Sequence, residues 1–296
     1  MLTIIVCTVS PSFLNTLKEN VESTVGIEYE WLVWDNSREN KGICEVYNRM
    51  AVLAKYSNLC FIHEDIQFRT EAWGRYVIDL LSNKEIGLIG IAGGKYKSKL
   101  LSGWYSGGQD RDYSNILHKV KDEEYHLSFP DHWTNNEIEV VCIDGAFMCC
   151  TKLTWEKIKF NEEILKGFHF YDIDFSLRVA QYKKVIVTNS INIEHFTKGG
   201  DFGDKWIEQA FIFHKAYKNM LPYFTSGINV HNAERETAKY WLDWLKDQPV
   251  SLGNRLKWVL QQKLYLSIKL WYSIIKFFLY RPLRLKYIHK MVKRFR

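Results

Sequence analysis

Short apolar runs alternate with helical segments along the first half of the chain, and this alternation limits the choice of folds. Four runs have the composition of buried strands, at 2–9, 31–34, 59–62 and 86–91. Strands separated by helices in this way are typical of βαβ units, whose strands run parallel. The sequence therefore predicts an α/β fold with a mostly parallel sheet. The helical spacing is carried by Val46, Met50, Leu53 and Ala54, and again by Trp73, Val77, Leu80 and Leu81.

Polar residues stand where three of these strands end. They are Ser10 after Val9, then Asp35 after Trp34, and then the triplet His63-Glu64-Asp65 after Ile62. In open α/β sheets, ligands bind outside the carboxyl ends of the strands. Carboxylates at that edge suit a hard cation such as Mg²⁺, whose shell a substrate diphosphate can complete. The alternative interpretation of the triplet is a solvated acidic turn.

The alternation stops at residues 95–137, where Lys, Ser, Gly, Tyr, Asp and Asn dominate. We expect this stretch to be irregular, and so long an irregular stretch in a compact domain is usually functional or disordered. Trp104, Tyr105 and Trp133 lie within it. These rings either stack on sugar rings at the edge of a site or anchor the stretch onto the core, and the sequence leaves both open.

Order returns with an expected strand at 138–143, which Asp144-Gly145 follows, and with further strands at 185–187 and 191–193. Between the expected strands at 138–143 and 185–187, Asp172 and Asp174 precede a short helix. Acidic side chains there could simply stabilise the first turn of that helix. His195 follows the last strand. A histidine there is either a hydrogen-bonded structural residue or a contact for metal or diphosphate.

Six cysteines are scattered along the chain, mostly within apolar runs, and no Cys-x-x-Cys occurs. This argues against a zinc site and for reduced, buried thiols in a cytosolic protein. No basic region precedes the first apolar run, and no uncharged apolar run reaches the length of a spanning helix. We therefore expect a cytoplasmic protein without a signal peptide or a transmembrane helix.

The net charge of +6 hides a strong asymmetry along the chain. Residues 249–296 contain 12 Lys or Arg and no Asp or Glu, whereas the other 248 residues carry 28 basic and 34 acidic side chains. From residue 253 onward, bases alternate with bulky apolar groups, and Lys269 and Lys276 fall on nearly one helix face. We expect a helix in an anionic membrane interface. Packing on the rest of the protein or on another subunit, and binding of nucleic acid, are the alternatives.

Four polar clusters thus stand at the ends of expected elements: Asp35, the triplet 63–65, Asp172 with Asp174, and His195. One chemistry uses all of them, the transfer of a sugar from a nucleotide diphosphate. It needs groups that hold the nucleoside and a cation that neutralises the departing diphosphate. It also needs a carboxylate that deprotonates the acceptor hydroxyl.

Several motifs carry a family resemblance through their order and spacing. They are Trp34-Asp35-Asn36-Ser37, Gly42 with Tyr47-Asn48, Phe61-Ile62-His63-Glu64-Asp65, Asp144-Gly145, Gly167 to Asp174, and Glu194-His195. With them the chain resembles family-2 glycosyltransferases of the GT-A fold, most closely the streptomycin-biosynthesis glycosyltransferase-like subgroup, over roughly residues 2–220. The resemblance implies a GT-A catalytic domain at residues 1–222, followed by a helical, basic and aromatic segment at 223–296.

The resemblance also implies roles for residues at matching positions. Asp35 would contact the base or ribose, and Asp65 would bind the metal that bridges the two phosphates. Asp172 would be the catalytic base. His63 replaces the first aspartate of the family's Asp-x-Asp motif. The remaining implied contacts are Thr8 and His63 to the nucleotide, His195 to the metal or diphosphate, and Asp144, Gly145, Asp174 and Lys198 to the donor sugar or acceptor.

The implied activity is a metal-dependent, inverting hexosyl transfer that uses Mn²⁺ or Mg²⁺. The donor would be a nucleotide sugar, with UDP expected first, and the acceptor a glycan or a lipid-linked saccharide in bacterial cell-surface polysaccharide assembly. The enzyme would lie on the inner face of the plasma membrane and bind no nucleic acid. Two other functions are weighed beside it: a non-catalytic module that binds nucleotide sugars or polysaccharides, and a nucleic-acid-binding protein that acts through its basic tail.

Overall fold

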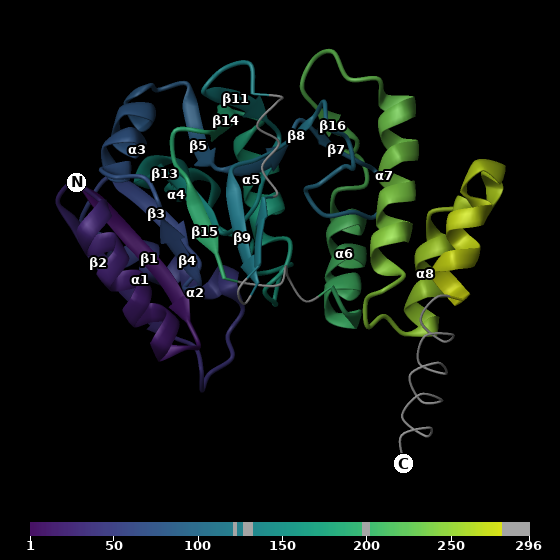
Figure 1. Ribbon diagram of the computed structural model, residues 1–296, viewed down its shortest axis with the longest axis horizontal. Coiled ribbons are helices and arrows are strands. Elements are labelled where there is room, and N and C mark those ends of the chain that lie inside the picture. The colour runs from purple at the N-terminus through teal and green to yellow at the C-terminus, as the bar shows by residue number, and fades with distance from the viewer. Residues whose placement is uncertain (121–122, 127–132, 197–201, 280–296) are drawn as a thin grey trace.

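The computed structural model describes residues 1–120, 123–126, 133–196 and 202–279. Its centre is a seven-stranded sheet with the order β11-β14-β5-β13-β3-β1-β2 (Figure 1). β1 pairs in parallel with β2 and β3, and β14 pairs in parallel with β5. The predicted α/β class with a mostly parallel sheet is therefore confirmed. The strands are β1 Leu2–Thr8, β2 Tyr29–Asp35, β3 Asn58–Ile62, β5 Ile86–Gly90, β11 Glu137–Val140, β13 Phe147–Thr151 and β14 Lys184–Thr188.

The sequence did not predict β13, which runs antiparallel between β3 and β5. Its apolar run is short and follows directly on the expected strand at 138–143. That expected strand is in fact two strands, because the chain leaves the main sheet at Val141, whose amide donates to the carbonyl of Gly94. Its first part is β11, and its second part, β12 (Cys142–Ile143), pairs with another sheet.

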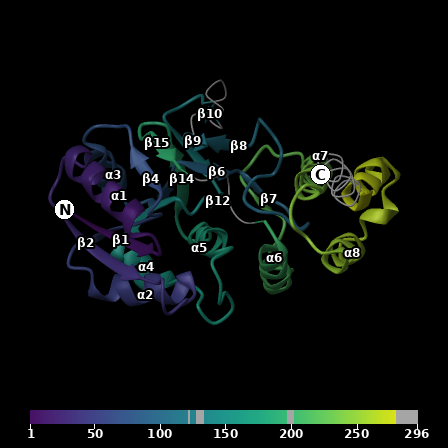
Figure 2. The same ribbon diagram turned by 60° about the horizontal axis from the view of Figure 1, so that its bottom comes forward.

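Helices cover both faces of the main sheet, as Figure 2 shows. On one face α1 (Pro11–Thr24) and α3 (Trp73–Ser82) pack against alternate residues of β1 and β3, such as Ile4 and Cys60. On the other face α2 (Ile43–Leu53), α4 (Lys152–Ile158) and α5 (Tyr171–Val179) pack against Ile5 and Phe61. Successive strand residues point to opposite faces, so an unbroken apolar run can feed both layers.

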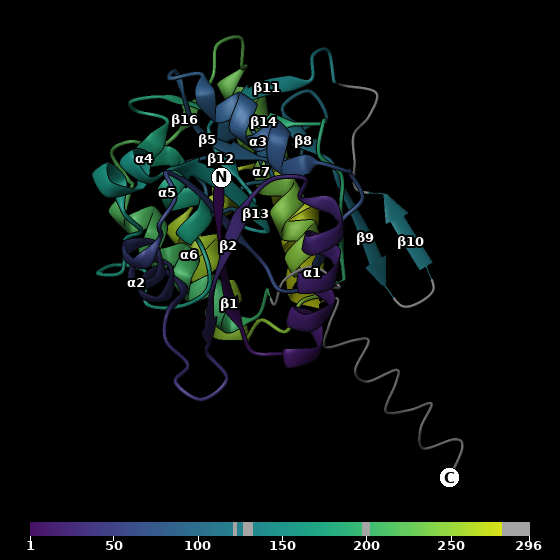
Figure 3. The ribbon, with the colours of Figure 1, turned by 90° about the vertical axis from the view of Figure 1, so that its left-hand side faces the viewer.

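A second sheet stands beside the carboxyl end of β3, with the order β10-β9-β15-β4. Its hairpin β9/β10 extends from the body of the protein in Figure 3. β15 lies between β4, with which it pairs antiparallel, and β9, with which it pairs in parallel. The bounds are β4 Ile66–Phe68, β9 Ile116–Val120, β10 Glu123–His126 and β15 Ile193–His195, so the strand expected at 191–193 lies slightly further along.

The prediction that residues 95–137 are irregular is wrong for much of the described part of this stretch. It contributes β9 and β10 to the four-stranded sheet. It also contributes β8 to the small sheet β12-β6-β8 and β7 to the small sheet β16-β7. β7 and β8 were missed because two or three residues are too few for a periodicity to show. The bounds of the short strands in these two small sheets are β6 Ala92–Gly94, β7 Tyr96–Lys97, β8 Asp112–Ser114 and β16 Tyr223–Phe224.

The remaining described chain is largely helical and forms the end of the protein farthest from β2 (Figure 1). It contains α6 (Asp204–Ala216), α7 (Val230–Leu245), α8 (Leu252–Gln261), two 3₁₀ turns at 264–266 and 268–270, and a helix at 271–279. Among the described residues, none of the helices has the length and hydropathy to cross a membrane. The predicted division at residue 222 stays a prediction, and α7 contacts residues on its other side, since Tyr96 donates to Glu234 and Ser106 accepts from Thr237.

Candidate functional site

Two sheets bring the first cluster together. His63, Glu64 and Asp65 form the turn by which the chain passes from β3 in the main sheet to β4 in the second sheet. In the second sheet Ile66 lies opposite His195, and the amide of Phe196 donates to the carbonyl of Asp65 over 2.8 Å. Strand pairing therefore places the end of β15 beside a turn that is 130 residues earlier in the chain.

The side chains of His63, Asp65 and His195 converge at this point. Nε2 of His195 lies 3.2 Å from Oδ1 of Asp65, and Nδ1 of His63 lies 3.9 Å from the same oxygen. One possible ligand atom from each residue lies within 4.8 Å of the other two. Burial opposes ionisation of Asp65, but the hydrogen bond with His195 holds the pKa of its carboxyl below the usual value. An ionised carboxylate and two imidazoles form a suitable donor set for a divalent metal ion.

Tyr171 sets the protonation pattern of His63. The Tyr171 hydroxyl donates to the carbonyl of Gly145 over 3.2 Å and lies 2.8 Å from Nε2 of His63. Since the hydroxyl has a single proton and the carbonyl can only accept, Nε2 of His63 carries a hydrogen and donates it to the hydroxyl. Nδ1, on the side of Asp65, is then left with its lone pair. Burial lowers the pKa of His63, and the neighbouring His195 lowers it further. The neutral imidazole, which is the form able to bind a metal ion, therefore predominates at neutral pH.

The predicted contact of His63 with the nucleotide stays a prediction, and in the structure its ring faces Asp65 and His195. The sequence had assigned the metal to Asp65 and His195 alone. Tyr171 was not predicted as a site residue. The signal that could have found it is its place directly before Asp172 in the quoted motif, at the first position of α5.

Asp172 stands at the start of α5, close to Asp144. Its Oδ1 accepts from the amide of Ile173 over 2.9 Å. Burial raises the pKa of Asp172 to about 7, and the negative charge of Asp144 contributes to the rise. Trp104 holds Asp144, because its indole nitrogen donates to Oδ2 over 2.9 Å while the amide of Ala146 donates to Oδ1. A carboxyl group with a pKa near neutrality can accept a proton during a reaction.

Gly145 contacts the hydroxyl of Tyr171, which also contacts His63. A Cβ added to Gly145 would come within 2.1 Å of the Tyr171 hydroxyl oxygen. The absence of a side chain at Gly145 therefore lets Tyr171 reach both the Gly145 carbonyl and His63. This contact explains the need for the Asp-Gly pair, which the sequence had marked only as lying near the donor sugar and acceptor.

Thr8 and Asp35 end neighbouring parallel strands, and their Cα atoms are paired in the sheet. The Thr8 hydroxyl donates to the carboxylate of Glu64, which also accepts from the amide of Ser10 over 3.0 Å. Glu64 thus contacts the end of β1, whereas its neighbours His63 and Asp65 face His195. Asp35 is exposed, and hydrogen bonds from Ser37 hold the pKa of its carboxyl below the usual value. Asp35 ends a half-buried edge strand, although we had expected a buried one.

Asp174 differs from the other candidates because its side chain has no exposed surface. Its carboxylate accepts from Arg178 over 2.9 Å, from the Tyr217 hydroxyl over 2.5 Å and from Asn161 over 3.3 Å. These contacts attach α5 to α6 and to the segment after α4. We therefore assign Asp174 a structural role instead of a contact with donor or acceptor. Lys198, the remaining candidate, lies outside the described residues.

The aromatic residues of the 95–137 stretch take different positions. Trp104 and Tyr105 lie edge to face, with ring centroids 5.6 Å apart, and Tyr105 contacts Tyr240 of α7 at 4.6 Å. Trp133 packs on Tyr113, with centroids 5.5 Å apart. These rings anchor the stretch, as one of the two interpretations proposed, and Trp104 in addition holds Asp144.

A model of the glycosyltransferase-like family matches residues 3–217. The streptomycin biosynthesis protein StrF of Streptomyces griseus is 21% identical over 192 residues, which are 62% of this chain and 64% of StrF, so the chain spans less than two thirds of that relative.

Among solved structures, the mannosyltransferase PcManGT from Pyrobaculum calidifontis, in complex with GDP-Man and Mn²⁺, has a TM-score of 0.50 to this chain. It is 10% identical, and the similarity covers 93% of this chain and 85% of PcManGT. The likeness confirms the predicted GT-A fold. At 10% identity, this similarity is evidence for the fold alone.

Proposed function

Because the chain belongs to the glycosyltransferase-like family, we propose that it transfers a sugar from a nucleotide-diphosphate sugar to an acceptor hydroxyl. One observation carries this proposal. Tyr171 joins a possible metal site, His63, Asp65 and His195, to the start of the helix that bears Asp172. A group that binds diphosphate and a group that accepts a proton are both needed for this reaction, and here one side chain connects them.

His63, Asp65 and His195 would hold a divalent metal ion, which when bound would neutralise the charge of the departing diphosphate. Two imidazoles beside one carboxylate suit Mn²⁺ better than Mg²⁺, which prefers oxygen ligands in octahedral geometry. The presence of Mn²⁺ and GDP-Man in the PcManGT complex supports this choice. Our donor expectation remains a UDP-sugar, and a GDP-sugar is the alternative that this neighbour brings in.

Asp172 would accept the proton of the acceptor hydroxyl as that oxygen attacks the anomeric carbon. A pKa of about 7 leaves a substantial fraction of this carboxyl ionised at neutral pH. Asp144, held by Trp104 and Ala146, would orient the sugar hydroxyls or the acceptor. Attack from the side opposite the departing diphosphate inverts the anomeric carbon, in agreement with the expectation from the family.

Thr8 and Asp35 would form the nucleoside end of the site, because both stand at the carboxyl ends of neighbouring strands. The acceptor would be a glycan or lipid-linked saccharide in cell-surface polysaccharide assembly, and the transferred sugar a hexose. We place the reaction in the cytoplasm, on the inner face of the plasma membrane.

The test is a screen of UDP, GDP and their sugars by calorimetry, with Mn²⁺, with Mg²⁺ and with a chelator. We expect one nucleotide to bind tightly only with metal. Hydrolysis of the corresponding nucleotide sugar should accompany its binding and release the nucleotide. Asp65→Ala should abolish the metal-dependent binding. Asp172→Asn should keep the binding and lower turnover by about a hundredfold or more.

Full turnover in either variant would remove the assignment of that residue. Tight binding of a nucleotide sugar without turnover, over a broad set of acceptors, would instead favour the non-catalytic binding module.

A further inference from the structure

The C-terminal described elements expose an unusual number of large apolar side chains. Ile268 is 86% exposed, Leu266 69%, and Leu256 51%. On α8 the exposed residues are spaced four apart, so they form one stripe along the helix. We call the whole set the basic apolar surface, and its apolar members are Leu252, Leu256, Leu260, Tyr265, Leu266, Ile268, Trp271, Tyr272, Ile275 and Leu279.

The other side of these elements is tightly packed, so the exposure does not reflect a loose structure. Trp258 of α8 is buried against Trp206 of α6, with ring centroids 6.0 Å apart. Arg255 is buried in the same layer, where it donates to the carbonyls of Val250 and Phe277 and lies over the Phe277 ring. The fold is thus held by one face of each element, while the apolar stripe on the opposite face takes no part in the core.

The segment that bears this stripe carries charge of a single sign. Lys257, Lys263 and Lys269 are exposed, and residues 249–296 include no Asp or Glu. Lysines beside apolar side chains are typical of helices that lie in a bilayer interface, where the chains enter the acyl boundary and the ammonium groups reach anionic headgroups.

We propose that the basic apolar surface binds an anionic lipid bilayer and lies along it. A second copy of the chain fits this surface less well, because two such faces would bring lysines together, and the segment that bears them has no Asp or Glu to pair them. Nucleic acid would engage the lysines but gains nothing from an isoleucine that is 86% exposed. An anionic bilayer satisfies both the lysines and the apolar stripe.

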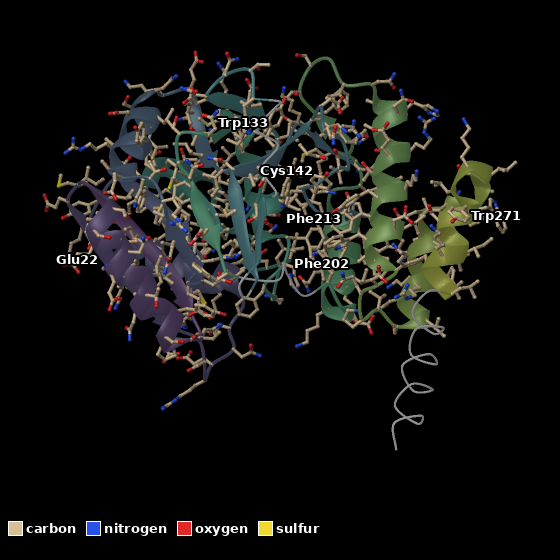
Figure 4. The ribbon with its side chains drawn as sticks, viewed as in Figure 1. Glu22, Trp133, Cys142, Phe202, Phe213 and Trp271 are labelled. Carbon is tan, nitrogen blue, oxygen red and sulfur yellow. The ribbon has the colours of Figure 1, made fainter. Side chains whose placement is uncertain are left out.

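The dimensions indicate contact along the surface of the bilayer rather than insertion across it. α8 has 10 residues, whereas a spanning helix needs about 20. Breaks at the two 3₁₀ turns follow α8 and divide the segment that we had expected to form one longer helix. Trp271, labelled in Figure 4, lies at the outer edge of this region.

This inference rests on the proposed function only for its biological purpose, which is to hold the site near a lipid-linked acceptor. Binding to vesicles needs neither donor nor metal, so the two proposals can fail separately. Conversely, nucleotide release in solution needs no membrane.

The experiment is flotation of the full-length protein with vesicles of phosphatidylcholine alone and of phosphatidylcholine with an equal amount of phosphatidylglycerol. We expect binding to the anionic vesicles only, weakened by high salt. Leu256→Glu with Ile268→Glu should weaken it by about tenfold or more, because acidic groups would then face the headgroups. Lys263→Glu with Lys269→Glu should weaken binding to a similar degree, because each lysine near an anionic membrane contributes about the same share of the binding free energy.

The matched control is Leu153→Glu on α4, the same leucine-to-glutamate change at a side chain that is 77% exposed outside the basic apolar surface. It should bind vesicles like the wild type. All variants should keep the wild-type melting temperature and metal-dependent nucleotide binding.

Three results would overturn the proposal. They are failure of the wild type to float with anionic vesicles, equal flotation of all variants, and a dimer in light scattering that Leu256→Glu with Ile268→Glu dissociates. Salt-sensitive binding to RNA or DNA that exceeds binding to the vesicles would assign the surface to nucleic acid instead.

Discussion

The Tyr171 hydroxyl lies 2.8 Å from Nε2 of His63. This contact links the turn after β3, which carries two of the three possible metal ligands, to the first residue of α5. Asp172 is the next residue along that helix. The positions of the metal site and of the proposed base are therefore coupled through one buried side chain.

Tyr171→Phe tests this coupling. The variant keeps the ring in the core and removes the acceptor of the Nε2 hydrogen, so the His63 imidazole is no longer fixed in one tautomer. Loss of such an outer contact typically weakens metal binding by about 10- to 100-fold. Titration of Mn²⁺ by calorimetry measures the effect. Tyr223→Phe, which also removes a hydroxyl-to-carbonyl hydrogen bond, is the matched control, and an equal loss of metal affinity there would contradict the prediction.

Gly145→Ala should displace Tyr171, because the new Cβ would come within 2.1 Å of its hydroxyl oxygen. Crowding of this kind in a packed region costs about 1–3 kcal/mol of unfolding free energy. We expect weaker metal binding together with the lower stability, measured by urea unfolding and Mn²⁺ titration. Gly253→Ala in α8, where a Cβ would meet nothing within 4 Å, should leave both unchanged or raise stability slightly.

The pH dependence of turnover should follow the ionisation of Asp172. Since its pKa is raised to about 7, kcat/KM should rise with pH through neutrality and reach a plateau above it. Asp144→Asn removes a negative charge that contributes to the rise, so it should move the acid limb to lower pH. A pH–rate profile of the two enzymes checks this, and identical profiles would show that another group controls the limb.

The same ionisation should lower stability as pH rises. The folded pKa of Asp172, about 7, lies above the unfolded value of about 4, so the folded state binds the proton more tightly. The contribution of Asp172 to stability is therefore most favourable below about pH 4, falls between about pH 4 and 7, and levels off above. Asp172→Asn carries no charge at any pH, so its advantage in melting temperature over the wild type should grow from pH 5 to pH 8. A constant difference across that range would exclude a buried ionisation at this position.

Local patterns in the sequence were sufficient for much of the fold. The apolar runs of β1, β3 and β5 and the helical spacing of α2 and α3 depend on neighbouring residues, so they can be recognised without the tertiary structure. The same holds for the polar residues at the ends of elements, which marked Asp65, Asp172 and His195 as candidates, while the family resemblance implied their roles. In the 95–137 stretch, β7 and β8 escaped because two or three residues carry no periodicity.

Only the tertiary structure decided which of these residues meet. β15 pairs with β4 and so brings His195 to Asp65 across 130 residues, and a register of this kind depends on contacts far apart in the chain. The same long-range packing buries Asp174 in a hydrogen-bonded network, attaches Glu64 to the end of β1 and places Tyr171 beside His63. The sequence alone determined which chemical groups stand at the ends of elements, because those ends are set by near neighbours. Sheet pairing and core packing determined which of these groups meet and which are buried, because they fix distance, burial and charge.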